Sequence, residues 1–366
     1  MNPPMINEGI ASAPARVPHE WGLKGLPTGH HNDCLRVLCY HRVGNPHSAG
    51  FKGFRPAFTA TADQFTRQMQ LVRRLFTPVS LQQLVLWLQE GKPLPRRPVL
   101  VTFDDGYRDN GDVAWPIMRE FGIPGVVFVA TDHIGTAKPF LWDFAAYCFQ
   151  MSALERIADP LIGERNLSTM AARHASTADW VAAAKRIPGS ERWTAAQALA
   201  DRLDVSPPEN AFAGFYLGWD DVRRLSRDGL EFGGHTCTHP ILTQLPTAEA
   251  QDEIAGCQAR LTEELGRSTL GFAYPNGSRS DYAVEHEEAV RNAGFAIAFT
   301  LEPGPLRLQE VRQRPMAVRR IYVGFHDNAP RFIAKLTGMS RLAAWAQGRG
   351  SRSDRAGTAY ENHDDV

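Results

Sequence analysis

The sequence predicts an α/β fold in which about seven strand–helix units form a barrel. Short runs of β-branched and aromatic residues alternate with segments whose apolar residues recur at helical spacing, as in Phe65, Met69 and Val72. Such alternation is typical of parallel strands joined by crossover helices. Because about seven units follow one another, a barrel, complete or incomplete, is favoured over a short open sheet.

Each element follows from this periodicity and from the Gly, Pro and Asp residues that separate the runs. The predicted strands cover residues 35–40, 98–103, 125–130, 230–234, 270–274, 296–300 and 319–323. The predicted helices cover residues 62–74, 81–89, 112–121, 219–228, 248–265, 284–293 and 331–336. The first strand is a continuous apolar run, which is typical of a buried strand.

The rest of the chain divides around this barrel. We expect a barrel domain over residues 34–347, with a helical insertion at about 149–215 that is polar, Ala-rich and helically spaced. Residues 1–33 are rich in Pro, Gly and His and predict a disordered arm. Residues 348–366 lack apolar anchors and predict a disordered tail.

Composition excludes several classes of protein. A chain of 366 residues with 43% hydrophobic content can bury a large core, which excludes a disordered protein. Forty basic and forty acidic residues balance to a formal charge of +0, so nucleic acid is not an expected partner. No apolar run is long enough for an integral membrane segment.

The cysteines and the first thirty residues bear on the compartment. The five cysteines are widely spaced, without a CxxC pair, and do not predict a disulfide framework. The first thirty residues contain no apolar run of signal-peptide length. Together these features predict a cytoplasmic protein in a reducing compartment.

Ionisable and turn residues follow several predicted strands directly. Asp104 and Asp105 come after the second strand, His235 and His239 after the fourth, and the Tyr274–Pro275 pair at the end of the fifth. The carboxyl ends of parallel barrel strands form one rim, which carries the active site in such folds. We therefore expect these side chains to meet.

The residue types at this rim indicate a metal site. Two imidazoles four positions apart can bind one ion if the segment between them curls, and a carboxylate from Asp104 or Asp105 would complete the set. Neighbouring strand residues point to opposite faces, so both aspartates serve one site only if the strand has ended by Asp105. Gly106 allows that turn.

Each signal also has a simpler interpretation. The HxxxH spacing occurs by chance, and Asp-Asp-Gly after a strand is usually a turn. Residues 274–277 (YPNG) form a typical β-turn sequence. Trp142, Tyr216 and Trp219 flank the insertion, and we assign them to packing although aromatic faces also stack on sugars. The signals gain weight only because they fall on one predicted rim.

These residues resemble a known family. Residues 102–106 (TFDDG) and 235–239 (HTCTH) are similar to the first two motifs of the polysaccharide deacetylases, the NodB-type carbohydrate esterases. Residues 38–43 (LCYHRV), 128–131 (FVAT) and 272–275 (FAYP) resemble segments of the exopolysaccharide-associated bacterial branch. The resemblance covers roughly residues 35–338.

The resemblance implies a deformed (β/α)7-type barrel, NodB-like, with a divalent metal ion, most often zinc. It implies that Asp104 is the general base and that Asp105, His235 and His239 are the metal ligands. It also implies that the backbone around Tyr274, Pro275 and Asn276 borders the acetyl pocket and the oxyanion.

The sequence departs from the family pattern at three points. Ala273 stands where many members have an arginine that tunes the base, and Asn276 replaces an aromatic residue. The late catalytic histidine has no secure match, which leaves His326 and His41 as alternatives for the general acid. Arg319 and Arg320 open the last strand, where one of them contacts substrate, braces the rim or is solvated.

The expected activity is hydrolysis of the N-acetyl group of an amino sugar in a polysaccharide or glycan precursor, a carbon–nitrogen bond that is not a peptide bond. The expected partner is an acetylated carbohydrate. Two alternatives remain: hydrolysis of an O-acetyl ester or of a small-molecule amide, and a non-catalytic sugar-binding protein that retains the metal. The intact Asp104 argues against a pure binder, which has no need of a base.

Overall fold

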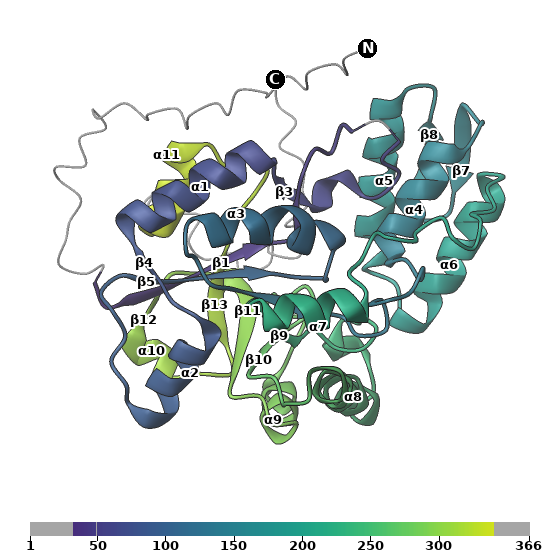
Figure 1. Ribbon diagram of the computed structural model, residues 1–366. Helices are drawn as coiled ribbons and strands as arrows, with labels where there is room; N and C mark the ends of the chain where they lie inside the picture. Colours follow the sequence, from purple (N-terminus) through teal and green to yellow (C-terminus); the bar gives the residue numbers. More distant parts are fainter. Residues whose placement is uncertain (1–31, 49, 340–366) are drawn as a thin grey trace, which may run out of the picture.

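A computed structural model describes residues 32–48 and 50–339 of the chain. Seven parallel strands form a closed ring, because β1 pairs with both β5 and β13. The α/β barrel predicted from the sequence is therefore confirmed, and helices surround it (Figure 1). The ring strands are β1 (Cys34–Tyr40), β5 (Pro98–Phe103), β6 (Gly125–Val129), β9 (Glu231–Gly234), β10 (Gly271–Ala273), β11 (Ile297–Pro303) and β13 (Val318–Tyr322).

The ring is uneven. β1 and β5 are paired over five residues, whereas β9 and β10 share one registered pair, Gly234 with Phe272. On this side the backbones approach closely: a Cβ on Gly233 would lie 2.5 Å from the carbonyl oxygen of Gly271. Only glycine fits such an approach. The barrel is thus deformed on the side that carries the histidine motif.

Helices cover the outside of the ring. Helix α1 starts at a capping box, in which Thr61 accepts from Gln64 and Gln64 accepts from Thr61, and it buries Phe65, Met69 and Val72 as predicted. Burying each of these side chains stabilises the fold by about 1.5–3 kcal/mol. The outer helices are α1 (Ala62–Leu75), α2 (Leu81–Glu90), α3 (Trp115–Glu120), α7 (Trp219–Arg227), α8 (Thr247–Leu265), α9 (Val284–Asn292), α10 (Leu308–Gln313) and α11 (Ala329–Leu336).

Several short elements are absent from the sequence prediction. A π-helical turn, Asn110–Ala114, precedes α3, and η3 (Leu242–Gln244) follows the histidine motif. Two to five residues carry no measurable periodicity, so such elements depend on their tertiary partners. The short strands are β2 (Arg42–Val43), β3 (Phe58–Ala60), β4 (Thr77–Pro78), β7 (Arg156–Asp159), β8 (Gly163–Asn166) and β12 (Leu306–Arg307).

The insertion lies between β6 and α7. It contains α4 (Leu141–Met151), the antiparallel β7–β8 hairpin, α5 (Met170–Ala184) and α6 (Gly189–Arg202), so its helices begin before residue 149. The three helices pack on one another around a core of their own that includes Phe149, Trp180 and Leu199. The insertion stands beside the barrel as a separate lobe in Figure 1.

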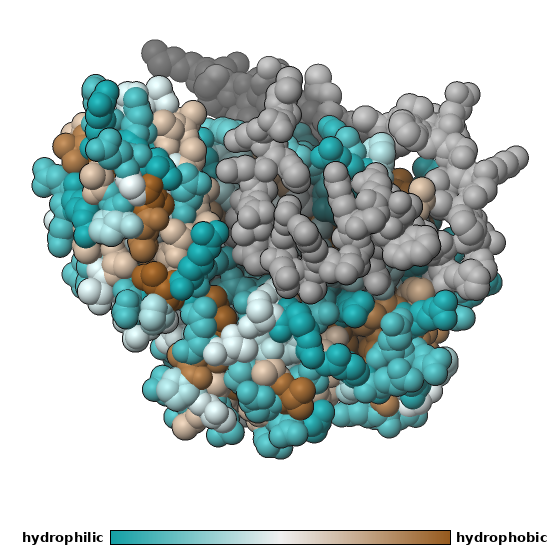
Figure 2. All heavy atoms as spheres, turned by 180° about the vertical axis from the view of Figure 1, so that it is seen from behind, coloured by the Kyte–Doolittle hydropathy of each residue, from teal (hydrophilic) through white to brown (hydrophobic). Residues whose placement is uncertain are grey.

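The surface of the insertion is partly apolar. In the rear view of Figure 2 the insertion forms the left lobe, where brown residues lie among teal ones. Met151, Leu154, Met170 and Trp193 are exposed large hydrophobic residues of this lobe. Single exposed hydrophobic residues are common on globular proteins, and these four do not change the assignment of the fold.

The predicted arm at residues 1–33, apart from Asn32 and Asp33, and the predicted tail at 348–366 lie outside the described residues. Within residues 32–339, position 49 excepted, no helix has the length and apolar character needed to cross a bilayer. The cytoplasmic location expected from the sequence stays a prediction.

Candidate metal centre and active site

The two aspartates after β5 reach one site because the chain turns sharply. β5 ends at Phe103, and Asp105 and Gly106 both have left-handed backbone conformations, with φ of 75° and 74°. A non-glycine residue with positive φ is strained, and such residues gather at functional sites. The turn predicted at Gly106 is present and begins at Asp105 itself.

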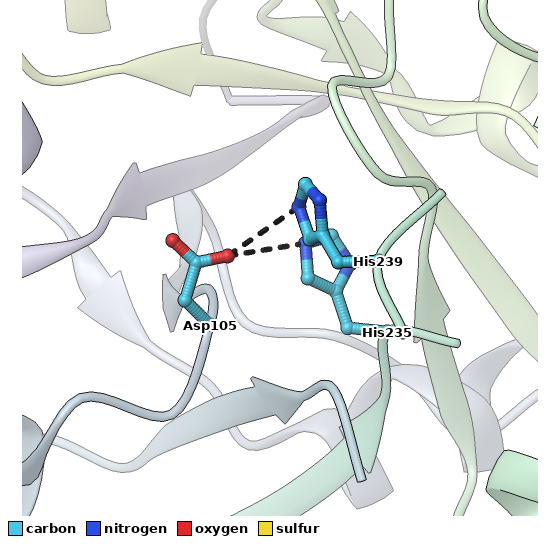
Figure 3. Close-up of side chains that lie close together, drawn as sticks. All are labelled: Asp105, His235 and His239. Atoms are coloured by element: carbon cyan, nitrogen blue, oxygen red, sulfur yellow. Dashed lines mark ion pairs between the residues drawn. The ribbon is translucent and has the colours of Figure 1, made fainter. Parts of the chain in front are cut away.

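Asp105 and the two motif histidines come together at the rim, as Figure 3 shows. The Oδ1 atom of Asp105 lies 3.6 Å from Nε2 of His235 and 3.5 Å from Nε2 of His239. One ligand atom from each of the three residues lies within 4.8 Å of the others. Two imidazole nitrogens and one carboxylate form a donor set suited to Zn²⁺ and related ions, with positions left open.

The backbone around the histidines aims both rings. His235 donates from Nδ1 to the carbonyl oxygen of Ala273, at 2.6 Å, because a carbonyl can only accept. Its Nε2 therefore keeps a lone pair toward Asp105, as a metal ligand requires. Thr236 and His239 have φ of 66° and 63°, and the Thr236 hydroxyl accepts from the His239 N–H. The segment 235–239 therefore curls, as expected if both histidines are to bind one ion.

The carboxylate of Asp105 fits a bound cation. Both of its oxygens are buried, and neither has a hydrogen-bond partner in the described structure. Burial raises the pKa of Asp105 well above its ordinary value, and the nearby Asp104 and Asp143 carboxylates add to this effect. A buried acceptor without a donor is costly, and a divalent ion would satisfy both oxygens.

Asp104 has the opposite surroundings. The Arg320 guanidinium donates from Nη1 and Nη2 to its two oxygens, both at 2.7 Å, and both residues are buried. Burial alone would raise the pKa of Asp104, but Arg320 and His235 outweigh it and hold that pKa below its usual range. Asp104 is therefore ionised at neutral pH, as a general base must be.

Arg320 supplies the arginine that the third motif lacks. It reaches Asp104 from β13, on a strand different from the one that carries Ala273, and it also donates from Nε to the carbonyl oxygen of Thr300 at 3.0 Å. Its neighbour Arg319 is partly exposed and lies 3.7 Å from Glu302. Of the alternatives left open for these two arginines, Arg320 braces the rim through Asp104.

Comparison with known proteins agrees with this geometry. The sequence profile described as polysaccharide deacetylase matches residues 91–298, more than half of the chain. The chain belongs to the polysaccharide deacetylase family. The matched stretch contains Asp104, Asp105, His235 and His239 but ends before Arg320, so the arginine on Asp104 comes from outside it.

Individual relatives of this deacetylase-family chain are distant. It is 25% identical over 117 residues to the poly-β-1,6-N-acetyl-D-glucosamine N-deacetylase of Staphylococcus epidermidis, an alignment that spans 27% of this chain and 40% of the relative. Streptococcus pyogenes deacetylase PplD, solved with acetate, matches with a TM-score of 0.54 at 14% identity, over 83% of this chain and 99% of PplD. IcaB from Ammonifex degensii matches with a TM-score of 0.53 at 21% identity, over 84% and 98%.

The two histidines considered as general acid lie in different surroundings. His41, at the end of β1, is buried, and its backbone is fixed by bonds to Asn110 and Thr59. Burial lowers the pKa of His41 to about 4, and the Asp104 charge opposes this effect. The His41 ring therefore interacts electrostatically with the candidate base. His326 is exposed, and its ring packs on Phe325. The structure thus brings His41 to the site and leaves His326 at the surface.

The YPNG segment is a turn whose residues face different ways. The Tyr274 ring is buried against Tyr282, and its hydroxyl donates to the carbonyl oxygen of Met316 at 3.0 Å. Pro275 is buried, and Asn276, with φ of 58°, lines the cavity next to His239. Tyr274 can thus border an acetyl pocket with its backbone alone, and a role for all three residues stays a prediction.

An aromatic residue of the insertion contacts a candidate metal ligand, although the sequence favours a packing role for it. Trp142, in the first turn of α4, packs edge-on against His239 with ring centroids 5.0 Å apart. Its Nε1 donates to the Tyr107 hydroxyl at 2.7 Å, and that hydroxyl donates to buried Asp143. Tyr216 also bonds to Asp143 and is buried, so it serves packing as expected.

A cavity of about 970 Å³ opens beside His239 between the barrel rim and the insertion. Trp142, Lys185 and Arg192 come from the insertion side, while His239 and Asn276 come from the barrel. A volume of this size accommodates a ligand larger than an acetyl group. The insertion therefore forms one wall of the candidate active site.

Proposed function

We propose that this protein is a metal-dependent hydrolase that removes N-acetyl groups from amino sugars of a polysaccharide or glycan precursor. One observation carries the proposal: a carboxylate and two imidazoles converge at the barrel rim, directly beside a second aspartate that is buried and ionised. Zinc suits this donor set, because catalytic zinc sites use three protein ligands, among them imidazoles and carboxylates, and leave one position open.

The residues divide the work of amide hydrolysis. Asp105, His235 and His239 would hold a divalent ion, which would lower the pKa of a bound water from ~15.7 towards ~7 and polarise the acyl carbonyl. Asp104 accepts the proton of the attacking water, and Arg320 keeps Asp104 ionised until then. His41 is the candidate that passes a proton to the departing amine nitrogen; because burial lowers the pKa of its imidazole to about 4, it would first have to accept that proton during the reaction.

The substrate class comes from the relatives and the cavity together. The Staphylococcus epidermidis relative is named for N-deacetylation of poly-β-1,6-N-acetyl-D-glucosamine, and the alignment covers 40% of that protein. The cavity is lined by Trp142 and Trp193, and aromatic rings are common partners of sugar faces. Both observations support an N-acetylated hexosamine as substrate.

Acetate release from β-1,6-linked N-acetylglucosamine oligomers tests the proposal. Purified protein loaded with zinc is expected to release acetate, protein treated with chelator is expected to release none, and added zinc is expected to restore release. Asp104→Asn should keep the metal and lose turnover. Turnover of acetyl esters without any turnover of amides would contradict the N-deacetylase assignment, and sugar binding without turnover of any acylated substrate would indicate a binding protein.

A further inference from the structure

A lysine of the insertion faces the candidate active site. Lys185 directly follows α5, is half-buried, and lines the same cavity as His239, Asn276 and Trp142. The next residue, Arg186, is exposed and does not line the cavity. The end of α5 therefore presents one cation to the site and the next one to solvent.

Hydrogen bonds hold this end of α5 against the barrel. Arg192 donates from Nε to the carbonyl oxygen of Ala184 at 3.0 Å and from Nη2 to that of Lys185 at 2.9 Å. Gln244, in the barrel turn η3, donates to the Lys185 carbonyl oxygen at 3.3 Å and accepts a short bond from Arg192. The backbone of Lys185 is thus bonded to both the insertion and the barrel, which fixes the place from which its side chain extends.

The charge of Lys185 affects the pKa values of two histidines of the site, the ligand candidate His239 and the acid candidate His41. Burial and His235 lower the pKa of His239, and Lys185 lowers it further. Lys185 also lowers the pKa of His41, by less than burial, Arg320 and His235 do, while the Asp104 charge raises it. Burial lowers the pKa of Lys185 itself to about 8, against the opposing charge of Asp281.

We propose that Lys185 is a substrate-binding residue of this site, whose ammonium donates hydrogen bonds to oxygen atoms of the sugar that carries the acyl group. The proposal rests on the proposed deacetylase function. An ammonium offers three donors and no lone pair, so it cannot be a metal ligand, and sugar hydroxyl and ring oxygens are matching acceptors.

A structural role for Lys185 makes a different prediction. If its only task were to attach the insertion to the barrel near Asp281, its removal would lower stability and disturb every substrate equally. A contact to the sugar affects only substrates that contain the sugar. The two roles can therefore be separated by comparing an acetylated oligosaccharide with a small acyl ester that lacks a sugar, such as para-nitrophenyl acetate.

Lys185→Met in the zinc-loaded protein provides the kinetic test. KM for a β-1,6-linked N-acetylglucosamine oligomer is expected to rise about 10- to 100-fold, the equivalent of one lost charge-assisted hydrogen bond, with a much smaller change in kcat. Hydrolysis of para-nitrophenyl acetate should stay within about twofold, and the affinity for zinc should not fall. Lys185→Arg should recover part of the loss, and Arg186→Met, which removes a cation from the same helix end, should behave as wild type.

Binding provides a second measurement that does not depend on turnover. In the Asp104→Asn background, calorimetric titration with the same oligomer should show weaker binding, by about 10- to 100-fold, when Lys185 is also replaced by Met. If the wild-type protein turned over no N-acetylated sugar but bound the oligomer through Lys185, the proposed function would fail and this proposal would stand. Unchanged KM and oligomer affinity in Lys185→Met, equal losses on ester and sugar, or reduced zinc affinity would each overturn the proposal.

Discussion

Two neighbouring carboxylates, Asp104 in the barrel interior near β13 and Asp105 at the rim above β9, have opposite electrostatic surroundings. In the interior, Asp104 receives two hydrogen bonds from Arg320, both at 2.7 Å. At the rim, Asp105 has two buried oxygens without a hydrogen-bond donor and two imidazole nitrogens about equally distant from one of them. Adjacent residues of the same type thus experience different electrostatic fields.

The difference indicates which of the two carboxylates needs a cation from outside the chain. The interior is complete, because the protein supplies the positive charge that its carboxylate needs. The rim is incomplete, since three potential ligands converge there and, within the described residues, the Asp105 oxygens have no hydrogen-bond donor. The pKa of Asp104 is lowered and that of Asp105 is raised, although the two residues are adjacent in sequence.

The largest expected effect comes from the incomplete region. Asp105→Asn removes a ligand that only a metal ion needs, so kcat is expected to fall on the order of 10³-fold or more, together with the affinity for zinc. Acetate release and zinc binding by competition with a chromogenic chelator measure the two losses. Asp112→Asn, at an exposed position of the following turn, is the matched control, and an equal loss there would remove Asp105 from its assigned role.

Replacing Arg320 tests the ion pair of the barrel interior. Arg320→Met leaves Asp104 as a buried, unpaired charge, and the free energy of unfolding is expected to fall by about 3–5 kcal/mol. Arg319→Met, one residue earlier, removes a partly exposed partner of Glu302 and should cost about 1 kcal/mol or less. Chemical denaturation monitored by circular dichroism measures both variants.

A double variant sharpens this test of the interior. Adding Asp104→Asn to Arg320→Met removes the unpaired charge, so part of the lost stability should return. If Arg319→Met were as destabilising as Arg320→Met, or if the double variant were the sum of the single ones, the view of the interior as a closed ion pair would be wrong.

His41 lies where the two regions meet, since the charges of Asp104, Arg320 and His235 all act on it. His41→Gln removes the candidate proton donor, and kcat is expected to fall about 10²-fold or more with zinc affinity unchanged. His326→Gln, at an exposed position, should change kcat by less than about threefold. Loss of activity in His326→Gln with a fully active His41→Gln would exchange the two assignments.

The positions of the site residues were predictable wherever they depend on strand ends. β5 ends at Phe103 as the sequence predicts, and the carboxyl ends of parallel strands share one rim, which brings Asp105 to His235 and His239. The family resemblance then distinguished base from ligand, a choice that the residues alone left open. A barrel of about seven strands was predictable from the alternation of strands and helices, whereas the closure of the ring, left open by the sequence, is shown by the pairing of β1 with β13.

Contacts between distant elements were not predictable in the same way. Arg320 reaches Asp104 because β13 closes the ring beside β1, and sequence spacing does not show which strand faces the base. One signal existed: Arg320 alternates with Val318 on the buried side of a strand, and a buried arginine requires a carboxylate partner. Trp142 and Lys185 reach the cavity only through the docking of the insertion, for which the sequence offers no periodic signal.

The smallest effect expected is the pH dependence of stability in the metal-free protein. Asp105 has a folded-state pKa above its ordinary value of 3.8, so the folded protein binds the proton more tightly than the unfolded chain, and stability falls as pH rises from that value through the folded-state pKa. Asp104 has a lowered pKa, so its contribution is present above 3.8 and is lost as pH falls through the folded-state pKa.

Two asparagine variants separate these opposite slopes. At neutral pH with chelator present, Asp105→Asn should be more stable than wild type by about 1–3 kcal/mol, because it removes a buried carboxyl group whose pKa is raised on folding. Asp104→Asn should be less stable, since Arg320 loses its counter-ion. Urea denaturation from mildly acidic to mildly alkaline pH measures the stability of both variants.

Saturating zinc should reverse the order of stability of Asp105→Asn and wild type, because only the wild type binds the ion tightly and gains stability from it. A metal-free Asp105→Asn protein less stable than wild type at every pH would mean that Asp105 serves the fold rather than a cation, and the contrast between the two carboxylates would disappear.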